Sequence, residues 1–476
     1  MVSQIKHRKV SLHKIWMIFL FGFATLLMFY QDGTVGPRFG LYFLDSLFDG
    51  KPFSFYGVAL QAGINEEGAN YDIGFYLLYG LWELPIWIFR HFAYINETSP
   101  LCLIWYKLLP VLFLFHSAKL IRDIAELLGF TYETQKVCSE WYLFSPLTFF
   151  PIFVACQCDI IPLTLCLAAT KYWMKGDFHK PLILFACAML TKPFAIFWLL
   201  LYCIMENRKI LQILGNFLFC VFPMLIFRFL YYFSPSFPAA RRPAKSENIS
   251  LFLDSSVPLG SGALSLFVFT LLILYLYAWM NPHFTSSKTD SKQAHNRSIV
   301  FLLWSIWLSF ILFVGVAPYW IIYFAPFSIL ILPYCHDSTK AAFLDLTAGS
   351  ALILHFIFIY PWVYGGSMTY GYSFLSRIAS NAHIYESGIT LAGVLRTFRI
   401  DRLLPAITAL YTASWLICGS SAIINTYKKK QGSQCLPALS STSNGKHQTI
   451  LRLCALTLFV LVTLATWYLS IKYRSL

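Results

Sequence analysis

Long apolar runs alternate with short polar segments along the whole chain. A run of about 20 apolar residues can cross a hydrocarbon core about 30 Å thick as a helix. Because a chain inside lipid must satisfy its own backbone hydrogen bonds, these runs predict helices. Roughly a dozen spans are expected by this length criterion, near residues 15–30, 73–92, 101–121, 139–156, 160–174, 181–206, 210–233, 262–280, 298–316, 319–335, 341–363, 403–425 and 451–471.

The fold prediction is an all-α polytopic membrane protein, one integral membrane domain over residues 1–476 with roughly 11–13 transmembrane helices. Run 15–30 has no small-residue cleavage site and is predicted to be a retained helix. Composition agrees with this class: 58% of residues are hydrophobic and 12% are charged, mean hydropathy is +0.62, and soluble domains are about a quarter charged.

Lys and Arg gather in short segments and give a formal net charge of +14. The positive-inside rule places such clusters on the cytoplasmic side, so the charge predicts topology and not a nucleic-acid partner. Residues 1–14 are then cytoplasmic and residues 31–72 lie on the outer face. The clusters are Lys6, Arg8, Lys9 and Lys14; Lys171, Lys175 and Lys180; Arg208 and Lys209; Lys288, Lys292 and Arg297; and Lys428, Lys429 and Lys430.

Three long segments are predicted to be outer loops, 31–72, 234–261 and 364–402, and long loops of a membrane protein usually carry function. The polar segments 283–297 and 427–450 are typical of cytoplasmic linkers.

The first outer loop is not a plain linker. Its apolar residues follow helical spacing and predict a short amphipathic helix lying in the membrane interface, which ends where Gly50-Lys-Pro-Phe interrupts it. The residues on this spacing are Phe39, Tyr42, Phe43, Ser46 and Leu47.

The run 181–206 carries basic residues before and after it, and Thr191-Lys192-Pro193 in its middle. A single span would put the two basic groups on opposite sides. Two short helices that meet at Lys192-Pro193, with both outer ends cytoplasmic, satisfy the charge rule and the proline. Such a broken hairpin requires a protein cavity around its tip.

Asp32 ends the first apolar run. It is either a residue that closes a helix or a general base on the outer face that takes a proton from an acceptor hydroxyl.

Gln157 and Asp159 interrupt another apolar stretch, where a carboxylate must be paired or face a water-filled cavity. The alternative for Asp159 is an N-cap of the 160–174 helix. Lys192 lies between apolar neighbours, so it is expected to pair with a carboxylate or a phosphate, or else to extend to an interface.

Arg241, Arg242 and Lys245 on the second outer loop could clamp a phosphate or form a solvated charge cluster. Pro318-Tyr-Trp320 and Tyr323 could form a sugar platform or an aromatic belt. The twelve cysteines lie mostly in apolar runs and imply neither a disulfide framework nor a metal site, since Cys156 and Cys158 have no second pair or His cluster nearby.

Three local patterns resemble the GT-C class of membrane glycosyltransferases, and most closely the bacterial proteins related to GPI and dolichol-phosphate-mannose mannosyltransferases. They are Asp32 after the first run with Tyr42, Gly50 and Asn70-Tyr71 before the second; Ile104-Trp-Tyr-Lys107-Leu-Leu-Pro110; and Cys156-Gln157-Cys158-Asp159 followed by Leu190-Thr-Lys192-Pro193. The resemblance covers the first part of the chain, to about residue 210; beyond it only the helix pattern and the region 318–326 are similar.

The chain departs from that family in two places. Relatives often carry a His-Glu-Arg-Tyr-like cluster where this chain has Gly315-Val-Ala-Pro-Tyr-Trp320, and Asp32 is followed by Gly33 and not by a second carboxylate.

The resemblance implies an inverting transfer of a mannose-like hexose from a polyprenyl phosphate to an acceptor hydroxyl on the outer face. Asp32 would be the base. The substrate-binding residues would be Gln157, Asp159, Lys192, Arg241, Arg242, Tyr71 and Tyr319. The leaving phosphate would be stabilised by Lys or Arg, with or without a divalent metal ion.

The expected partners are the lipid-linked donor, a glycan or lipid acceptor and membrane lipids. The expected membrane is the bacterial plasma membrane, with the endoplasmic reticulum as the alternative. Two other functions stay open: a transporter or flippase of lipid-linked sugars, and a catalytically silent GT-C-like scaffold.

Overall fold

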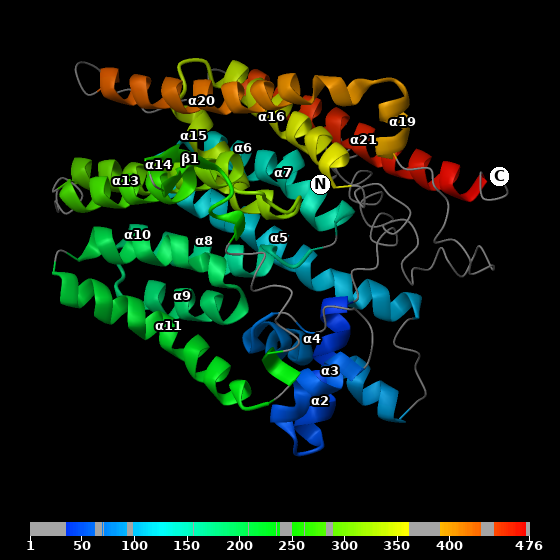
Figure 1. The fold of residues 1–476 in the computed structure, drawn as a ribbon. Helices are drawn as coiled ribbons and strands as arrows, with labels where there is room; N and C mark the ends of the chain where they lie inside the picture. Colours follow the sequence, from blue (N-terminus) through cyan, green and yellow to red (C-terminus); the bar gives the residue numbers. More distant parts are fainter. Residues whose placement is uncertain are drawn as a thin grey trace, which may run out of the picture.

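The computed structural model describes residues 35–61, 69, 71–92, 99–155, 157–207, 209–234, 236–238, 250–260, 262–281, 289–360, 391–429 and 442–472. It is mostly helical, at 85%. Figure 1 shows the helices stacked side by side, with α20 and α16 at one edge of the stack and α2 and α3 at the other. The α-helices are α2 (Val35–Phe48), α3 (Phe55–Gln61), α4 (Ile73–Phe92), α5 (Pro100–Leu127), α6 (Tyr132–Leu143), α7 (Pro146–Phe149), α8 (Ile160–Lys175), α9 (His179–Thr191), α10 (Ile196–Glu206), α11 (Ile210–Tyr232), α13 (Leu266–Met280), α14 (Thr289–Phe313), α15 (Ala325–Ile331), α16 (Ser338–Ile359), α19 (Leu391–Thr397), α20 (Leu404–Lys429) and α21 (Thr442–Lys472).

Short helical turns and one hairpin of strands complete the described elements. The strands pair antiparallel, with Ser256 opposite Ser265. These elements are the 3-10 turns η1 (Pro52–Ser54), η3 (Pro193–Ala195), η5 (Trp320–Tyr323), η6 (Leu332–Tyr334) and η8 (Ile400–Leu403), the π-helical turn η2 (Phe150–Val154), and the strands β1 (Ser256–Leu259) and β2 (Gly262–Ser265).

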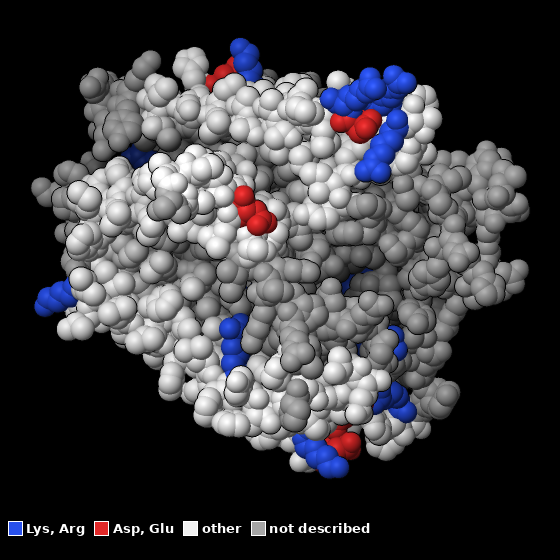
Figure 2. Space-filling view, in the orientation of Figure 1, with Lys and Arg blue, Asp and Glu red and all other residues white. Residues whose placement is uncertain are grey.

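Six helices among the described residues are long and apolar enough to cross a membrane, or seven if the bent pair Tyr132–Leu143 and Pro146–Val154 is one span. Four shorter apolar helices of 10–17 residues accompany them. On the face shown in Figure 2 the described surface is mainly uncharged, with charged side chains in a few separate groups. The chain is therefore a helical multi-pass membrane protein. The predicted total of 11–13 spans stays a prediction, and the predicted span 15–30 lies outside the described residues.

Two predicted spans differ in detail from the structure. The predicted span 139–156 contains a break, because Ser145 precedes Pro146 and a residue before proline is disfavoured in a helix; the chain bends there by 49°. The predicted span 262–280 begins as strand β2, and its helix begins only at Leu266, where the Ser265 hydroxyl accepts a hydrogen bond from the Val268 amide at 3.3 Å.

The helix predicted in the first outer loop is confirmed as α2. Phe39 and Phe43 are buried and Leu47 is exposed. The Phe39 ring meets the Tyr76 ring of α4 edge to face, with centroids 6.1 Å apart. The apolar face of α2 therefore packs on protein. Gly50, with a positive φ of 70°, follows the helix end.

The predicted broken hairpin is confirmed as α9 and α10. α9 ends at Thr191, Lys192 is extended, and Pro193 opens the turn η3 that leads into α10. The Tyr202 hydroxyl near the end of α10 donates a 3.0 Å hydrogen bond to the Phe178 carbonyl at the start of α9. The two outer ends of the hairpin therefore lie together, as the charge pattern required.

Several helices end on one side of the bundle beside Lys and Arg residues. This side is here called the basic end. The Lys292 ammonium of α14 donates to the Lys175 carbonyl of α8 at 3.2 Å, and Lys171 pairs with Asp123 at 2.7 Å. The positive-inside rule predicts that this end is the cytoplasmic side, which stays a prediction.

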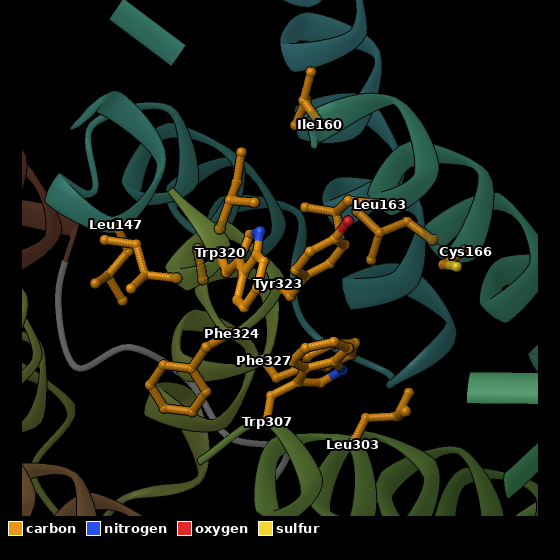
Figure 3. Close-up of a cluster of buried hydrophobic side chains, with 14 of the residues drawn as sticks. Leu147, Ile160, Leu163, Cys166, Leu303, Trp307, Trp320, Tyr323, Phe324 and Phe327 are labelled. Carbon is orange, nitrogen blue, oxygen red and sulfur yellow. The ribbon is translucent and has the colours of Figure 1, made fainter. Parts of the chain in front are cut away.

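The core between α8, α14 and η5 is densely aromatic. Figure 3 shows Trp307, Tyr323 and Phe327 in one cluster of buried side chains with Leu163 of α8. The Trp307 and Tyr323 rings stack with centroids 4.8 Å apart and planes 19° apart. Stacked rings of this kind hold Tyr323 in place.

Candidate functional site

Lys192 is the centre of the candidate site. The residue has extended backbone angles, φ −154° and ψ 130°, between α9 and η3. Pro193 causes the break, because proline removes a backbone donor and disfavours helix at the residue before it. Lys192 thus occupies the tip of the hairpin and not a helix surface.

The Lys192 ammonium forms an ion pair with Asp159 Oδ1. The Tyr323 hydroxyl donates a 2.9 Å hydrogen bond to the same oxygen. The Asp159 side chain is 1% exposed and that of Lys192 is 14% exposed, so the carboxylate is desolvated while the ammonium keeps some access. Asp159 Oδ2 is buried without a hydrogen-bond partner among the described residues.

Four aromatic rings surround the Lys192 ammonium and are here called the aromatic cage. A cation within about 6 Å of a ring centroid is attracted by the negative face of the ring. The distances from Nζ to the centroids are 5.2 Å for Phe194, 5.5 Å for Tyr71, 5.5 Å for Trp320 and 5.7 Å for Tyr319.

Tyr71 is held at both backbone groups. Its amide donates to the Tyr76 hydroxyl at 2.9 Å, and its carbonyl accepts from the Tyr56 hydroxyl at 3.0 Å. Its ring stacks on Phe75, with centroids 4.3 Å apart. The first predicted outer loop therefore delivers a fixed ring to the cage.

A second ion pair lies beside Tyr71. Arg228 of α11 donates two 2.8 Å hydrogen bonds to the two oxygens of Asp72. Asp72 is buried, whereas a third of the Arg228 side chain is exposed. In this bidentate pair the guanidinium donates to both carboxylate oxygens, and it connects the residue before α4 to α11. This pair was not predicted from the sequence, although an arginine within the apolar run 210–233 is a signal for such a pair.

Of the predicted site residues, the structure brings together Tyr71, Asp159, Lys192 and Tyr319. Asp159 does occupy the N-cap position of α8, as one interpretation predicted, but its side chain accepts no capping hydrogen bond there. Gln157 donates its backbone amide to the Pro151 carbonyl at 2.9 Å, and no side-chain contact joins it to Lys192 within the described ranges. The predicted residues Asp32, Arg241 and Arg242 lie outside the described residues.

No group of three or more His, Cys, Asp or Glu side chains that could hold a metal ion occurs in the described part of the chain.

The candidate site lies at the opposite end of α8 from the basic end. Asp159 directly precedes the helix and Lys175 is its last residue. A helix of 16 residues is about 24 Å long, so the candidate site and the basic end are separated by about this length. The Lys192 ammonium has a single charged partner and is surrounded by aromatic rings. Such a site can bind a ligand that has an anionic group attached to a partly apolar ring.

Comparison with protein-family models, with curated proteins and with solved structures finds no match to this chain.

Proposed function

We propose that this chain is a GT-C-like glycosyltransferase that moves a mannose-like hexose from a polyprenyl phosphate to an acceptor hydroxyl on the outer face of the membrane. The observation that carries the proposal is the Lys192 ammonium, paired with Asp159 and enclosed by four rings, at the end of the bundle opposite the basic end. An intramembrane lysine held this way marks a substrate site by default.

In the proposed reaction Asp32 takes the proton of the acceptor hydroxyl, and the hydroxyl oxygen attacks the anomeric carbon with inversion. The bond from that carbon to the phosphate oxygen breaks, and the polyprenyl phosphate leaves with the electron pair. The Lys192 ammonium stabilises the negative charge that develops on the phosphate. Asp159 and Tyr323 position Lys192, while Tyr71 and Tyr319 pack on the sugar.

The other predicted ligands have supporting roles in this proposal. Arg241 and Arg242 contact the donor phosphate from the second outer loop, and Gln157 contacts the sugar. The acceptor is a glycan or a lipid, and a bacterial plasma membrane is the preferred location.

The test is sugar transfer by the full chain in nanodiscs, with a radiolabelled polyprenyl-phosphate mannose and a panel of acceptors. Lys192→Met and Asp32→Asn should each lower the transfer rate by about 100-fold or more, as loss of a charge-stabilising group or base does. Arg402→Gln, which changes an exposed cation outside the site, is the matched control and should transfer at the wild-type rate. Equal transfer by wild type and both site variants would contradict the proposal.

One observation favours a flippase of lipid-linked sugars as the second candidate. Asp345 and Arg452 are buried charges in the second half of the chain, and buried charges in both halves suit a transporter. Movement of a fluorescent polyprenyl-phosphate sugar across protein-containing vesicles, without transfer to any acceptor, would support the flippase in place of the transferase.

A further inference from the structure

A groove separate from the candidate site runs between α13, α14 and α20, helices that Figure 1 shows near one another in the upper part of the stack. Its volume is about 300 Å³, at the lower limit of small-molecule sites. The residues that line it are mostly apolar: Leu274, Tyr277, Ala294, Arg297, Ser298, Phe301, Leu302, Ser305, Ile423 and Thr426.

The two flanks of the groove face away from the protein. On α13, Leu272 and Leu276 are 55% and 53% exposed, and on α20 Ile423 and Ile424 are 40% and 54% exposed. α20 is long and apolar enough to cross a membrane and α13 is a shorter apolar helix, so the large apolar side chains exposed on them are suited to contact with lipid. The groove is therefore open to the acyl chains of the bilayer.

Arg297 is the charged residue among those that line the groove. No carboxylate of the described residues pairs with its guanidinium. The hydroxyls of Ser298 and Ser305 donate to carbonyls of their own helix, those of Ala294 and Phe301, and so supply no negative charge. The groove thus pairs an apolar wall with one uncompensated cation.

Arg297 lies in the half of α14 that is nearer the basic end. Its neighbour Asn296 donates a 2.9 Å hydrogen bond to the Leu127 carbonyl at the end of α5, which belongs to the basic end. In the sequence Lys428, Lys429 and Lys430 follow Thr426 closely. A basic pocket between helices at the cytoplasmic interface is the setting in which anionic lipid headgroups bind.

We propose that this groove binds one membrane phospholipid with an anionic headgroup, from the leaflet at the basic end. The Arg297 guanidinium donates to the headgroup phosphate, for which its planar fork is suited. One acyl chain lies along Leu274, Phe301 and Leu302. The site is independent of Lys192 and of the proposed transferase reaction.

The experiment is native mass spectrometry of the full chain, released from detergent micelles that contain equal amounts of phosphatidylglycerol and phosphatidylcholine. Wild type should retain one phosphatidylglycerol in preference to phosphatidylcholine. Arg297→Glu should lower the retained phosphatidylglycerol by about fivefold or more, the change expected for one cation at an anionic surface. Arg402→Glu makes the same charge change before the first residue of α20, whereas the groove contacts Thr426 near its last turn, and should retain the lipid as wild type does.

A second variant tests the groove without changing its charge. Ala294→Phe places a ring in the groove and should lower retention of both lipids, while thermal unfolding in detergent shows whether the variant is folded. Inorganic phosphate should not displace the lipid, because the acyl chain supplies part of the binding. Retention of phosphatidylglycerol by Arg297→Glu at the wild-type level, equal retention of both lipids by wild type, or displacement by phosphate alone would each overturn the proposal.

Discussion

Asp345 of α16 and Arg452 of α21 form a 2.9 Å ion pair that is wholly inside the protein, with the side chains 1% and 0% exposed. The Trp415 indole donates a 3.2 Å hydrogen bond to the other carboxylate oxygen, and the guanidinium lies 5.3 Å from the Trp141 ring centroid. This pair joins the last helix of the chain to the bundle.

Removal of one member of this pair should be costly. Arg452→Met leaves the Asp345 carboxylate buried without its counter-ion, and the expected loss of stability is about 3–5 kcal/mol. The double variant Asp345→Leu with Arg452→Met removes both charges and should recover most of that loss. Thermal unfolding in detergent, followed by intrinsic fluorescence, measures both. A double variant no more stable than the single one would contradict this account.

Gly419 of α20 lies against the Trp304 ring, which is itself buried. A Cβ at this position would lie 2.0 Å from a ring carbon. Gly419→Ala should therefore destabilise the protein by about 1–3 kcal/mol, the usual cost of overpacking. Gly215→Ala in α11 is the matched control: a Cβ there meets nothing within 4 Å, and higher helix propensity should leave stability unchanged or raise it by up to about 1 kcal/mol. Equal unfolding temperatures for the two variants would be inconsistent with this packing.

Asp337 caps α16 outside the membrane-spanning residues. Its carboxylate accepts hydrogen bonds from the amides of Lys340 at 3.0 Å and Thr339 at 3.1 Å. The Lys340 amide is the main cause that lowers the pKa of Asp337 below its ordinary value of 3.8. A carboxyl with a lower pKa in the folded state stabilises above its unfolded pKa, and this contribution disappears as the pH falls through the folded pKa.

The unfolding temperature of wild type should therefore fall relative to that of Asp337→Asn as the pH drops below about 4 and through the lowered pKa of Asp337, because the amide caps without titrating. At neutral pH, Asp337→Ala should cost about 1 kcal/mol. Parallel pH profiles for wild type and Asp337→Asn would show that the carboxylate makes no such contribution.

Tyr202→Phe removes the hydrogen bond from Tyr202 to the Phe178 carbonyl and leaves the ring contacts with Trp173 and Phe185 in place. The expected loss is about 1 kcal/mol, with the hairpin still formed. Hydrogen exchange of the amides of α9 and α10 should show faster opening of this hairpin. Unchanged exchange would mean that the bond contributes nothing to holding the two helices together.

Binding of the proposed donor gives a graded test of Lys192. Lys192→Arg keeps a cation next to Asp159 and should retain part of the affinity for a non-hydrolysable polyprenyl-phosphonate sugar, whereas Lys192→Met should lower it by about tenfold or more. Lys180→Met, which removes an exposed lysine near the basic end, should bind as wild type does. Isothermal titration in nanodiscs gives the three affinities, and an unchanged affinity in Lys192→Met would rule out a contact with the phosphate.

The sequence could predict those features that depend on local pattern. Pro193 between two basic groups predicted the α9–α10 hairpin, and the helical spacing after Arg38 predicted α2. Asp159 and Lys192 were each expected to need a charged partner, because an unpaired charge in an apolar run is costly.

What the sequence could not predict depends on contacts between distant residues. Tyr323 meets Asp159 across 164 positions, and Arg452 meets Asp345 across 107. Helical periodicity does not predict which helices pack against each other. Only the lone charged residues within apolar runs could have suggested these pairs. The break at Ser145-Pro146 was not predicted, because apolar residues lie on both sides of it, from Trp141 to Phe144 and from Leu147 to Val154.

The α9–α10 hairpin returns to the end from which it starts, so it adds no net crossing of the membrane. The connection after Gly176 and the start of α11 at Ile210 therefore face the same compartment. Reporter groups at these two positions should be reached by membrane-impermeant reagents from the same side. A relative that had lost the hairpin would keep every later helix in its present orientation, while losing Lys192 from its site.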